Sequence, residues 1–546
     1  METLSTSRTQ SWLTWFLRGL LILGFIIVIG RLLELQIIKG DYYRNLAEGN
    51  RIRRVPITAP RGKVLARGGE VLVGNNEVKK RVVFNPESGY EKLDNLEGAE
   101  EEEIITEWER DYKLGIPLAH VTGYVGEVNE DEVGTISPEC PEKGPRMIGQ
   151  FIGRGGLEEE YECLLSGIDG EELVEVDSSG RKIRVLGKRE PVAGRDIQTT
   201  IHYNLQEEIH KIMSEAELPP DRQGAVVVTD TEGEVLALYS SPSFDPNILV
   251  EGKDPEKIEK ILKDSRLPLF NRVIGGAFPP GSIFKPLLAV AGLEEGEIDK
   301  NYTYEDTGQI TIDSPYGKFT YSNWYFSQYG RTEGEIDLTR AIARSTDTFF
   351  YKLGELVGID DIVDWSHKFG LGEKTGIDLP GEVEGLVPSP EWKRKVKDEQ
   401  WFLGNTYHVS IGQGDLSVTP IGINTAISAI ASGNLCTPTI AGEKDCKDLR
   451  IDKDNLELVK EGMREVCSEG GTGYPFFDFS PQVACKTGTA ETYEEGVTHA
   501  WFTAFAPVDF PEIVATVLIE KGGEGSSVAA PIARKIFDFW FNNVTQ

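Results

Sequence analysis

The feature that most constrains this chain is an almost uninterrupted apolar run near its N-terminus, at residues 11–38. A helix needs about 20 apolar residues to cross the hydrocarbon core of a bilayer, and this run is long enough. Its arginines, Arg18 and Arg31, can extend their long side chains to the polar interfaces. No small-residue cleavage site follows the run. The sequence therefore predicts an uncleaved membrane anchor at 12–38, after a short cytoplasmic tail at 1–11.

The charge balance of the chain excludes one class of partner but does not fix its orientation. Lysine and arginine total 57 against 89 aspartate and glutamate, a net charge of -32. Such a chain repels phosphate backbones, so nucleic-acid binding is not expected. More basic residues follow the apolar run than precede it, which would leave the C-terminal part inside the cell. Large domains are nevertheless translocated largely regardless of flanking charge, so the orientation has to follow from the chemistry.

The pattern of the chain changes near residue 200. Residues 39–200 consist of short alternating apolar runs separated by Gly- and Asn-rich turns, which is typical of strands and hairpins, with few candidate catalytic residues. In 201–546, a predicted hairpin at 223–244 and three further predicted strands between 480 and 520 enclose helical stretches. This order predicts an α+β domain whose sheet joins the two ends of the region.

Ser282 and Lys285 are the strongest candidates for a catalytic pair. They follow Pro-Pro-Gly at 279–281 and begin an apolar helical stretch, so they share one helix face near an N-terminus that favours developing negative charge. A serine hydroxyl needs a base to become a nucleophile, and burial lowers the pKa of a lysine enough for it to act as one. A second tetrad, Ser179 to Lys182, lies in a polar turn and is interpreted as structural.

Two further motifs each occur in more than one copy. Lys-Thr-Gly is found at 374–376, in a turn-rich loop, and at 486–488, where it ends an apolar run ahead of a strand. A catalytic cation with backbone donors fits the strand, so we select the second copy. Of the Ser-x-Asn/Asp elements at Ser243, Ser345 and Ser432, only the one at Ser345 lies between the other two motifs, beside an amphipathic helix.

Taken in order, PPGSIFK, STDTFFYKLG and KTGTAE resemble the active-site signature of the class B penicillin-binding proteins, which are peptidoglycan D,D-transpeptidases. The resemblance covers nearly the whole chain. It implies a non-catalytic, dimerisation-like pedestal at 39–200 and a serine β-lactamase-like transpeptidase domain at 201–546, with an antiparallel sheet flanked by helices. Asp347 and the string EWK…W…GNT…IGQG are closer to the elongation-type branch, penicillin-binding protein 2.

The resemblance also implies the site residues. They are catalytic Ser282, Lys285, Ser345, Asp347 and Lys486, and substrate-binding Thr487, Gly488 and Thr489. Lys285 would take the proton of Ser282, which attacks the carbonyl between the two terminal D-Ala residues of a stem peptide. Backbone N–H groups of Ser282 and Thr489 would form the oxyanion hole. Ser345 and Lys486 would pass a proton to the leaving amine.

Two of these implied roles concern the substrate and the lysine. Thr487 and Thr489 would hold the terminal carboxylate of the stem peptide. Asp347 would orient Lys285 or the incoming strand, with a helix cap as its alternative role.

The implied function is the cross-linking of stem peptides through a serine acyl-enzyme, in elongation and shape maintenance, with β-lactams acylating the same serine. Division-type and sporulation-type transpeptidases, and a membrane-anchored β-lactamase-like hydrolase, are the alternatives. Because the substrate lies outside the cytoplasm, a single-pass protein of the cytoplasmic membrane with an extracytoplasmic domain is expected. The implied partners are a glycan polymerase of the shape, elongation, division and sporulation family and other elongation-complex proteins, which would bind the pedestal. No cofactor is implied.

Some residues depart from the family pattern or leave alternatives open. Ala66 replaces an expected acidic residue, and the segment between Asn75 and His120 is short for the head of a pedestal. The six histidines form no zinc or Ser-His-Asp pattern, and the six cysteines have no metal spacing, so no metal is expected. Cys436 and Cys446 could close a short loop, but six free thiols packed as small hydrophobic groups is the favoured interpretation.

Overall fold

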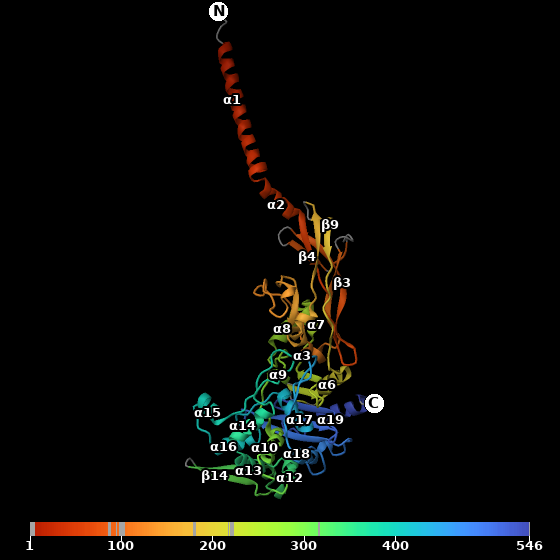
Figure 1. The fold of residues 1–546 in the computed structure, drawn as a ribbon, viewed down its shortest axis with the longest axis vertical. Coiled ribbons are helices and arrows are strands. Elements are labelled where there is room, and N and C mark those ends of the chain that lie inside the picture. Colours follow the sequence, from red (N-terminus) through yellow and green to blue (C-terminus); the bar gives the residue numbers. More distant parts are fainter. Residues whose placement is uncertain are drawn as a thin grey trace, which may run out of the picture. The chain divides into compact units, whose positions relative to one another are not determined.

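The structure of the chain is a computed structural model that describes residues 6–85, 89–93, 95–97, 104–177, 182–216, 218, 223–314 and 317–544. The chain falls into two compact units, which are described separately (Figure 1). The first unit comprises Met1–Pro60, Asn76–Glu109 and Gly167–Ala193, and the second comprises Arg61–Asn75, Arg110–Ser166 and Gly194–Gln546. Both units therefore contain segments that are distant in sequence.

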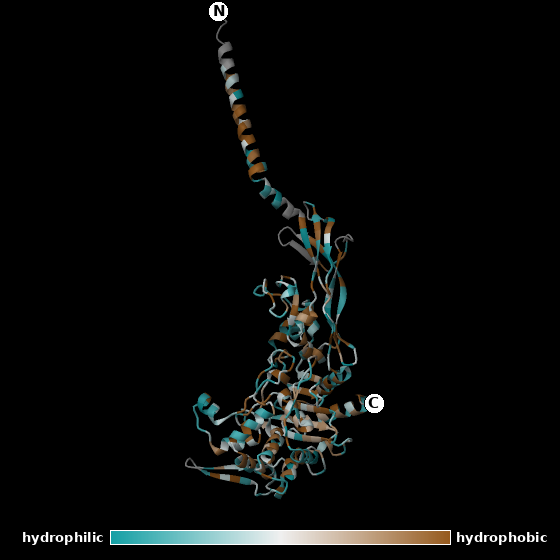
Figure 2. Ribbon diagram, viewed as in Figure 1, coloured by the Kyte–Doolittle hydropathy of each residue, from teal (hydrophilic) through white to brown (hydrophobic). Residues whose placement is uncertain are grey.

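The first unit begins with the predicted anchor. Helix α1 (Thr6–Leu33) continues into a π-helical turn, η1 (Glu34–Ile38), and is followed by α2 (Gly40–Arg51). The stretch Trp12–Ile38 contains a window with a mean hydropathy of 2.3, and no residue of that window is buried. Figure 2 shows this helix as hydrophobic over most of its described length. Among the described residues it is the one helix long and apolar enough to cross a membrane, which is consistent with a single-pass anchor.

The rest of the first unit is built from strands, as the alternating sequence predicts. Strands β1 (Ile52–Ile57), β8 (Gly170–Val176) and β9 (Lys182–Arg189) form an antiparallel sheet in the order β1-β8-β9. Side chains of β1 alternate between exposed and half-buried, because successive residues of a strand point to opposite faces. A long strand, β3 (Val71–Asn85), pairs with β4 (Gly89–Leu93) within this unit.

The second unit contains a five-stranded sheet in the order β12-β11-β21-β20-β19. Its strands are β11 (Gly224–Thr229), β12 (Val235–Ser241), β19 (Ala484–Glu491), β20 (Thr498–Ala506) and β21 (Ile513–Ile519), and all neighbours are antiparallel. Val226 pairs with Val517, so the first hairpin of the region joins its C-terminal strands, as predicted. Every residue of β11, β12 and β21 is buried, so helices cover both faces of the sheet.

The helices around this sheet position the motifs. Helix α10 (Lys285–Glu294) packs against α13 (Asp347–Val357) and α18 (Lys453–Val466), and α12 (Leu338–Arg344) packs against α18 (Figure 1). Residues Lys285–Leu293 of α10 are all buried, because the helix is apolar around its whole circumference. The helical segment between Leu338 and Val357 is interrupted, and the interruption lies at Ser345 and Thr346.

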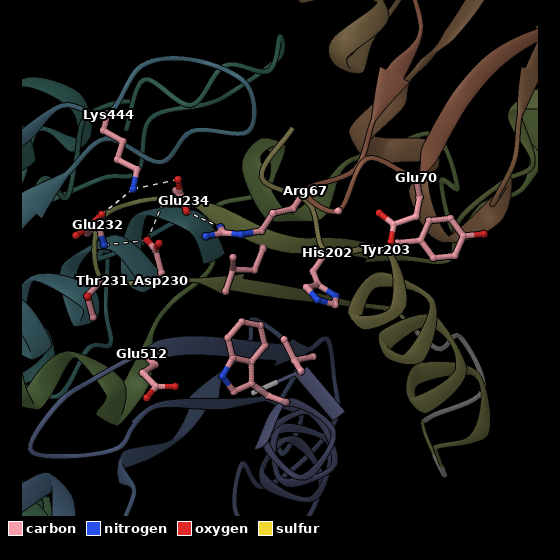
Figure 3. A pocket seen from close by; sticks show the side chains of 14 residues that line it. Arg67, Glu70, His202, Tyr203, Asp230, Thr231, Glu232, Glu234, Lys444 and Glu512 are labelled. Carbon is pink, nitrogen blue, oxygen red and sulfur yellow. Dashed lines mark hydrogen bonds and ion pairs between the residues drawn. The ribbon is translucent and has the colours of Figure 1, made fainter. Parts of the chain in front are cut away.

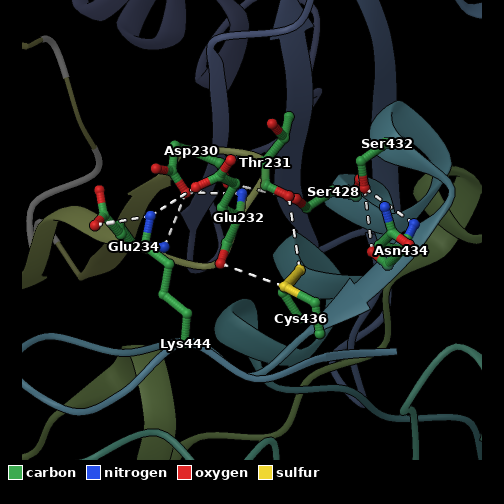
Figure 4. Close-up of a disulfide and its surroundings, with 10 residues drawn as sticks. Asp230, Thr231, Glu232, Glu234, Ser428, Ser432, Asn434, Cys436 and Lys444 are labelled. Atoms are coloured by element: carbon green, nitrogen blue, oxygen red, sulfur yellow. Dashed lines mark hydrogen bonds and ion pairs between the residues drawn. A yellow bond between two sulfur atoms is a disulfide. The ribbon is translucent and has the colours of Figure 1, made fainter. Parts of the chain in front are cut away.

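The cysteines correct a prediction, because all six are paired. The disulfides are Cys140–Cys163, Cys436–Cys446 and Cys467–Cys485. The favoured interpretation of free thiols was therefore wrong, whereas the alternative of a loop closed by Cys436 and Cys446 is correct. Strands β17 (Asn434–Cys436) and β18 (Cys446–Asp448) set these two residues opposite each other. Figure 4 shows Cys436 beside the turn at Asp230–Glu234.

Candidate active site

Ser282 lies in a single 3-10 turn, η5 (Gly281–Phe284), that leads directly into α10. Gly281 has φ 57°, and a Cβ there would lie 2.8 Å from the carbonyl oxygen of Thr489, so the position requires glycine. The Gly281 N–H donates to the carbonyl of Gly412 at 2.8 Å. The Ser282 side chain is half-buried, whereas Ile283 and Phe284 beside it are buried. The turn therefore fixes the serine at the surface of a packed core.

Lys285 is fully buried and donates three hydrogen bonds. Its Nζ lies 2.9 Å from the carbonyl oxygen of Ser345, 3.2 Å from Ser345 Oγ and 2.6 Å from Asp347 Oδ1. These contacts use all three hydrogens of an ammonium group. Burial lowers the pKa of Lys285, and the negative charge of Asp347 opposes that shift. Among the described residues, these are the hydrogen-bond partners of Lys285, and Ser282 is not one of them.

Lys486 belongs to the Lys-Thr-Gly motif on the edge strand β19 and also contacts Ser345. Its Nζ lies 2.9 Å from Ser345 Oγ and 2.9 Å from the carbonyl oxygen of Thr487. The pKa of Lys486 is lowered well below its ordinary value, first by burial and then by the charge of Lys285. Ser345 Oγ thus accepts hydrogen bonds from two lysines, which use both of its lone pairs, and its own hydrogen remains for a third partner.

The break between α12 and α13 explains how Ser345 reaches both lysines. Ser345 has φ 56°, in the left-handed region, and ends α12, and Asp347 begins α13. Asp347 Oδ2 accepts the Trp324 N–H at 2.9 Å, in addition to the ion pair of its other oxygen with Lys285. The carboxylate of Asp347 therefore joins the lysine to the start of α11 (Trp324–Tyr329).

Two polar residues that the sequence analysis did not identify, Asn323 and Asp306, support Asp347 through hydrogen bonds. Asn323 Oδ1 accepts the Asp347 N–H at 3.1 Å, and its Nδ2 donates to Asp306 Oδ2 at 3.2 Å. The buried Asp306 also accepts the Thr348 hydroxyl at 2.6 Å. These residues come from outside the three motifs, so motif spacing gives no signal for them.

The third motif lies on β19 against the turn that carries Ser282. A Cβ on Gly488 would lie 3.0 Å from Cγ2 of Ile283 and 3.1 Å from the carbonyl oxygen of Pro280, so the strand approaches η5 closely. Thr487 Oγ1 is 2.8 Å from Thr472 Oγ1. Thr489 is exposed, and its Oγ1 accepts the Gly525 N–H at 3.4 Å. The motif therefore borders the serine turn on one side and solvent on the other.

The other copies of the motifs have contacts elsewhere. Glu382 accepts hydrogen bonds from the hydroxyl of Thr375, at 2.6 Å, and from its N–H, at 2.8 Å. The hydroxyls of Ser243 and Ser432 donate to backbone carbonyls, which Figure 4 shows for Ser432. Ser179, in the second Ser-x-x-Lys tetrad, lies outside the described residues.

A cavity of about 610 Å³ lies elsewhere in the second unit (Figure 3). Its lining includes Arg67, His202, Asp230, Glu234 and Lys444, and none of the site residues predicted from the sequence. Glu234 pairs with Arg67 at 2.5 Å and with Lys444 at 3.0 Å. Burial raises the pKa of Asp230 to about 6. The lining carries two cationic side chains, Arg67 and Lys444, against five carboxylates, so it has an excess of negative charge.

Two family models match the chain. The model described as penicillin binding protein transpeptidase domain matches residues 223–538, and that described as penicillin-binding protein dimerisation domain matches residues 89–199.

Individual relatives match nearly full length. The peptidoglycan D,D-transpeptidase MrdA of Haemophilus influenzae is 32% identical over 606 residues, which cover 96% of this chain and 91% of MrdA. A penicillin-binding protein, PBP2, from Helicobacter pylori, solved in complex with MreC, is 27% identical with a TM-score of 0.76, over 90% of this chain and 99% of that one. A chain of a peptidoglycan synthase complex, solved to show how polymerization and crosslinking are coordinated, is 30% identical with a TM-score of 0.76, over 99% and 100%.

Proposed function

The chain belongs to the penicillin-binding protein transpeptidase family, and from that premise we propose that it is a peptidoglycan D,D-transpeptidase whose nucleophile is Ser282. The observation that carries the proposal is the convergence of two buried lysines, Lys285 and Lys486, on Ser345 Oγ. Gly281 and Ile283, on either side of Ser282, both approach β19, so the serine is next to this cluster.

The first step forms the acyl-enzyme. When Lys285 is neutral it keeps two N–H donors, enough for Asp347 and the carbonyl of Ser345, and its lone pair takes the Ser282 proton. The serine oxygen then bonds to the carbonyl carbon between the two terminal D-Ala residues of a stem peptide. Backbone N–H groups of Ser282 and Thr489 stabilise the oxyanion, and the loss of one such donor costs about 10²–10³ in rate.

The tetrahedral intermediate then expels the terminal D-Ala. Ser345 delivers a proton to the leaving amine and is reprotonated by Lys486, which it already contacts at 2.9 Å. Thr487 and Thr489 bind the terminal carboxylate, and Gly488 lets the strand approach the serine turn. An amine of a neighbouring stem peptide attacks the ester carbonyl, and its proton passes through Ser345 to Lys486. Lys285 returns a proton to Ser282 as the ester bond breaks, and the cross-link forms.

β-Lactams enter the same sequence of steps. Attack of Ser282 on the lactam carbonyl opens the ring, and the amine that leaves stays tethered to the acyl group. The tethered amine blocks the approach of an acceptor, so the acyl-enzyme persists.

The disulfides and the apolar helix support an extracytoplasmic location for the catalytic domain. Disulfides form and persist in oxidising compartments outside the cytoplasm. Because α1 is long enough to anchor the chain, we place residues 39–546 on the outer side of the cytoplasmic membrane. Within them, residues 39–200 act as the pedestal and residues 201–546 as the transpeptidase domain.

The partner proposal follows from the relatives. One of them was solved with MreC and another within a peptidoglycan synthase complex. By analogy, the pedestal of this chain binds a membrane glycan polymerase of the shape, elongation, division and sporulation family, and the protein acts in cell elongation. Depletion of the protein would then round rod-shaped cells. Filamentous cells would instead indicate a division role, and a defect confined to spores would indicate a sporulation role.

A transpeptidation assay tests the proposed function. The full-length protein in detergent is incubated with glycan strands that carry pentapeptide stems, and released D-Ala and cross-linked dimers are measured. Ser282→Ala should release no D-Ala, whereas Ser179→Ala, in the other Ser-x-x-Lys tetrad, should match the wild type. Release by Ser282→Ala would refute the nucleophile. Release of D-Ala by the wild type without dimers would show a hydrolase instead of a transpeptidase.

A further inference from the structure

Thr472 is a hydroxyl residue outside the three motifs that contacts one of them directly. Its Oγ1 lies 2.8 Å from Thr487 Oγ1 on β19. Thr472 comes from the turn that follows α18 and is half-buried, whereas Thr487 is only 8% exposed. The proposed function gives Thr487 the task of binding the substrate carboxylate, and Thr472 has no role in it.

A disulfide holds this turn against β19. Cys467 directly follows α18, and its partner Cys485 lies on β19 shortly before Thr487. Both cysteines are buried. Cys485 and Thr487 are two apart on the strand, so their side chains share one face. The bridge therefore closes a covalent loop that contains Thr472 and ends two residues before Thr487.

The turn is also packed closely against the disulfide. A Cβ on Gly473 would lie 2.9 Å from Sγ of Cys485 and 3.0 Å from Sγ of Cys467. The Gly473 N–H donates to the carbonyl of Val466 at 2.8 Å, which closes the turn onto the end of α18. A side chain on the residue next to Thr472 would thus collide with both sulfur atoms.

We propose that Thr472 is a positioning residue that orients the Thr487 hydroxyl toward the substrate carboxylate, and that the Cys467–Cys485 disulfide holds Thr472 in place. This inference rests on the proposed function. Each hydroxyl has one hydrogen to donate. When Thr472 donates to Thr487, the Thr487 hydrogen is left for the carboxylate, and such a chain of hydrogen bonds strengthens each member. Without Thr472, the Thr487 hydroxyl loses the partner that orients it.

The test compares two acyl donors that differ in one charge. Second-order acylation rates of the full-length protein in detergent are measured with benzylpenicillin, which carries a carboxylate, and with its methyl ester, which does not. Thr472→Val should slow the acid about five- to tenfold, the effect of one lost hydrogen bond, and leave the ester nearly unchanged. Thr472→Ser should restore the rate. Ser468→Ala, in the same turn but bonded to the Arg464 carbonyl, is the matched control and should behave as the wild type.

The disulfide is tested in the same assay. The double variant Cys467→Ala, Cys485→Ala should show the same acid-selective loss as Thr472→Val. Combining all three substitutions should add no further acid-selective loss, because the bridge acts through Thr472. A further loss in the combined variant would overturn the role assigned to the disulfide.

The remaining outcomes separate this inference from the proposed function. Equal slowing of acid and ester by Thr472→Val, or no slowing of either, would overturn the positioning role. Thermal unfolding of each variant shows whether equal slowing comes from lost stability. If Ser282→Ala were still acylated by benzylpenicillin, the proposed function would fail instead, whatever Thr472 does.

Discussion

Replacing Asp347 with asparagine removes the negative charge of a carboxylate that contacts the buried Lys285. The two groups form an ion pair at 2.6 Å, in which the lysine side chain is 0% exposed and the aspartate side chain 13%. At this distance, two unit charges attract by about 6 kcal/mol at an effective dielectric constant of about 20. Desolvation offsets much of that attraction, and removal of one partner of a buried pair typically costs about 3–5 kcal/mol.

We expect Asp347→Asn to lower the unfolding free energy by about 3 kcal/mol, the low end of that range, because asparagine keeps the shape and one acceptor. It should also change the pH dependence of acylation. Asp347 stabilises the charged form of Lys285 and so raises its pKa against the effect of burial. Without that charge, Lys285 loses its proton at lower pH.

The assay is the acylation rate with benzylpenicillin as a function of pH, for full-length wild type and Asp347→Asn. Acylation requires neutral Lys285, so the rate rises as the pH passes through the pKa of the lysine. The rising limb should lie at lower pH in the variant, even if the plateau rate falls. A limb that stays in place, or moves to higher pH, would refute the assignment of Lys285 as the base that Asp347 controls.

Three further changes, one of them with a matched control, test other parts of the site and fold. Gly281→Ala should reduce acylation by at least about 10²-fold, since its Cβ would lie 2.8 Å from the carbonyl oxygen of Thr489 and force the serine turn away from β19. Gly296→Ala, at φ 73° with no atom within 4 Å, carries the same backbone strain and should acylate normally. Asp306→Ala should lower the melting temperature and slow acylation, because it leaves the buried partners of that carboxylate unpaired; normal values for both would refute its supporting role. Removing the Cys436–Cys446 disulfide should lower the unfolding free energy by about 3 kcal/mol, because the bridge restricts the unfolded chain, and should leave acylation unchanged. Denaturant unfolding measures this cost, and an unchanged stability would contradict the reasoning.

Local pattern and motif order were enough to predict the catalytic half of the fold. The apolar helix that begins at Lys285 explains why that lysine is buried, and the strand that carries Lys486 was evident from its apolar flanks. The pairing of the first hairpin with the last strands also followed from element order. For the helix and the strand the deciding information is local, whereas the pairing of the hairpin follows from the order of the elements along the chain.

The features that sequence reasoning missed depend on residues brought together from distant segments. Asn323 and Asp306 support Asp347 from outside its motif, and nothing in their own neighbourhood marks them. The disulfides Cys140–Cys163 and Cys467–Cys485 span 23 and 18 positions, and burial is expected of a free thiol as much as of a bridge. Only the folded arrangement decides between those states.

The central claim, that Ser282 forms the acyl-enzyme, is tested most directly by weighing the intact full-length protein after incubation with penicillin. The wild type should gain the mass of one penicillin, the adduct should persist, and peptide mapping should place it on Ser282, whereas Ser282→Ala should gain nothing. An adduct that disappears within seconds would indicate a β-lactamase. An adduct on Ser282→Ala, or one mapped to another residue of the wild type, would contradict the account.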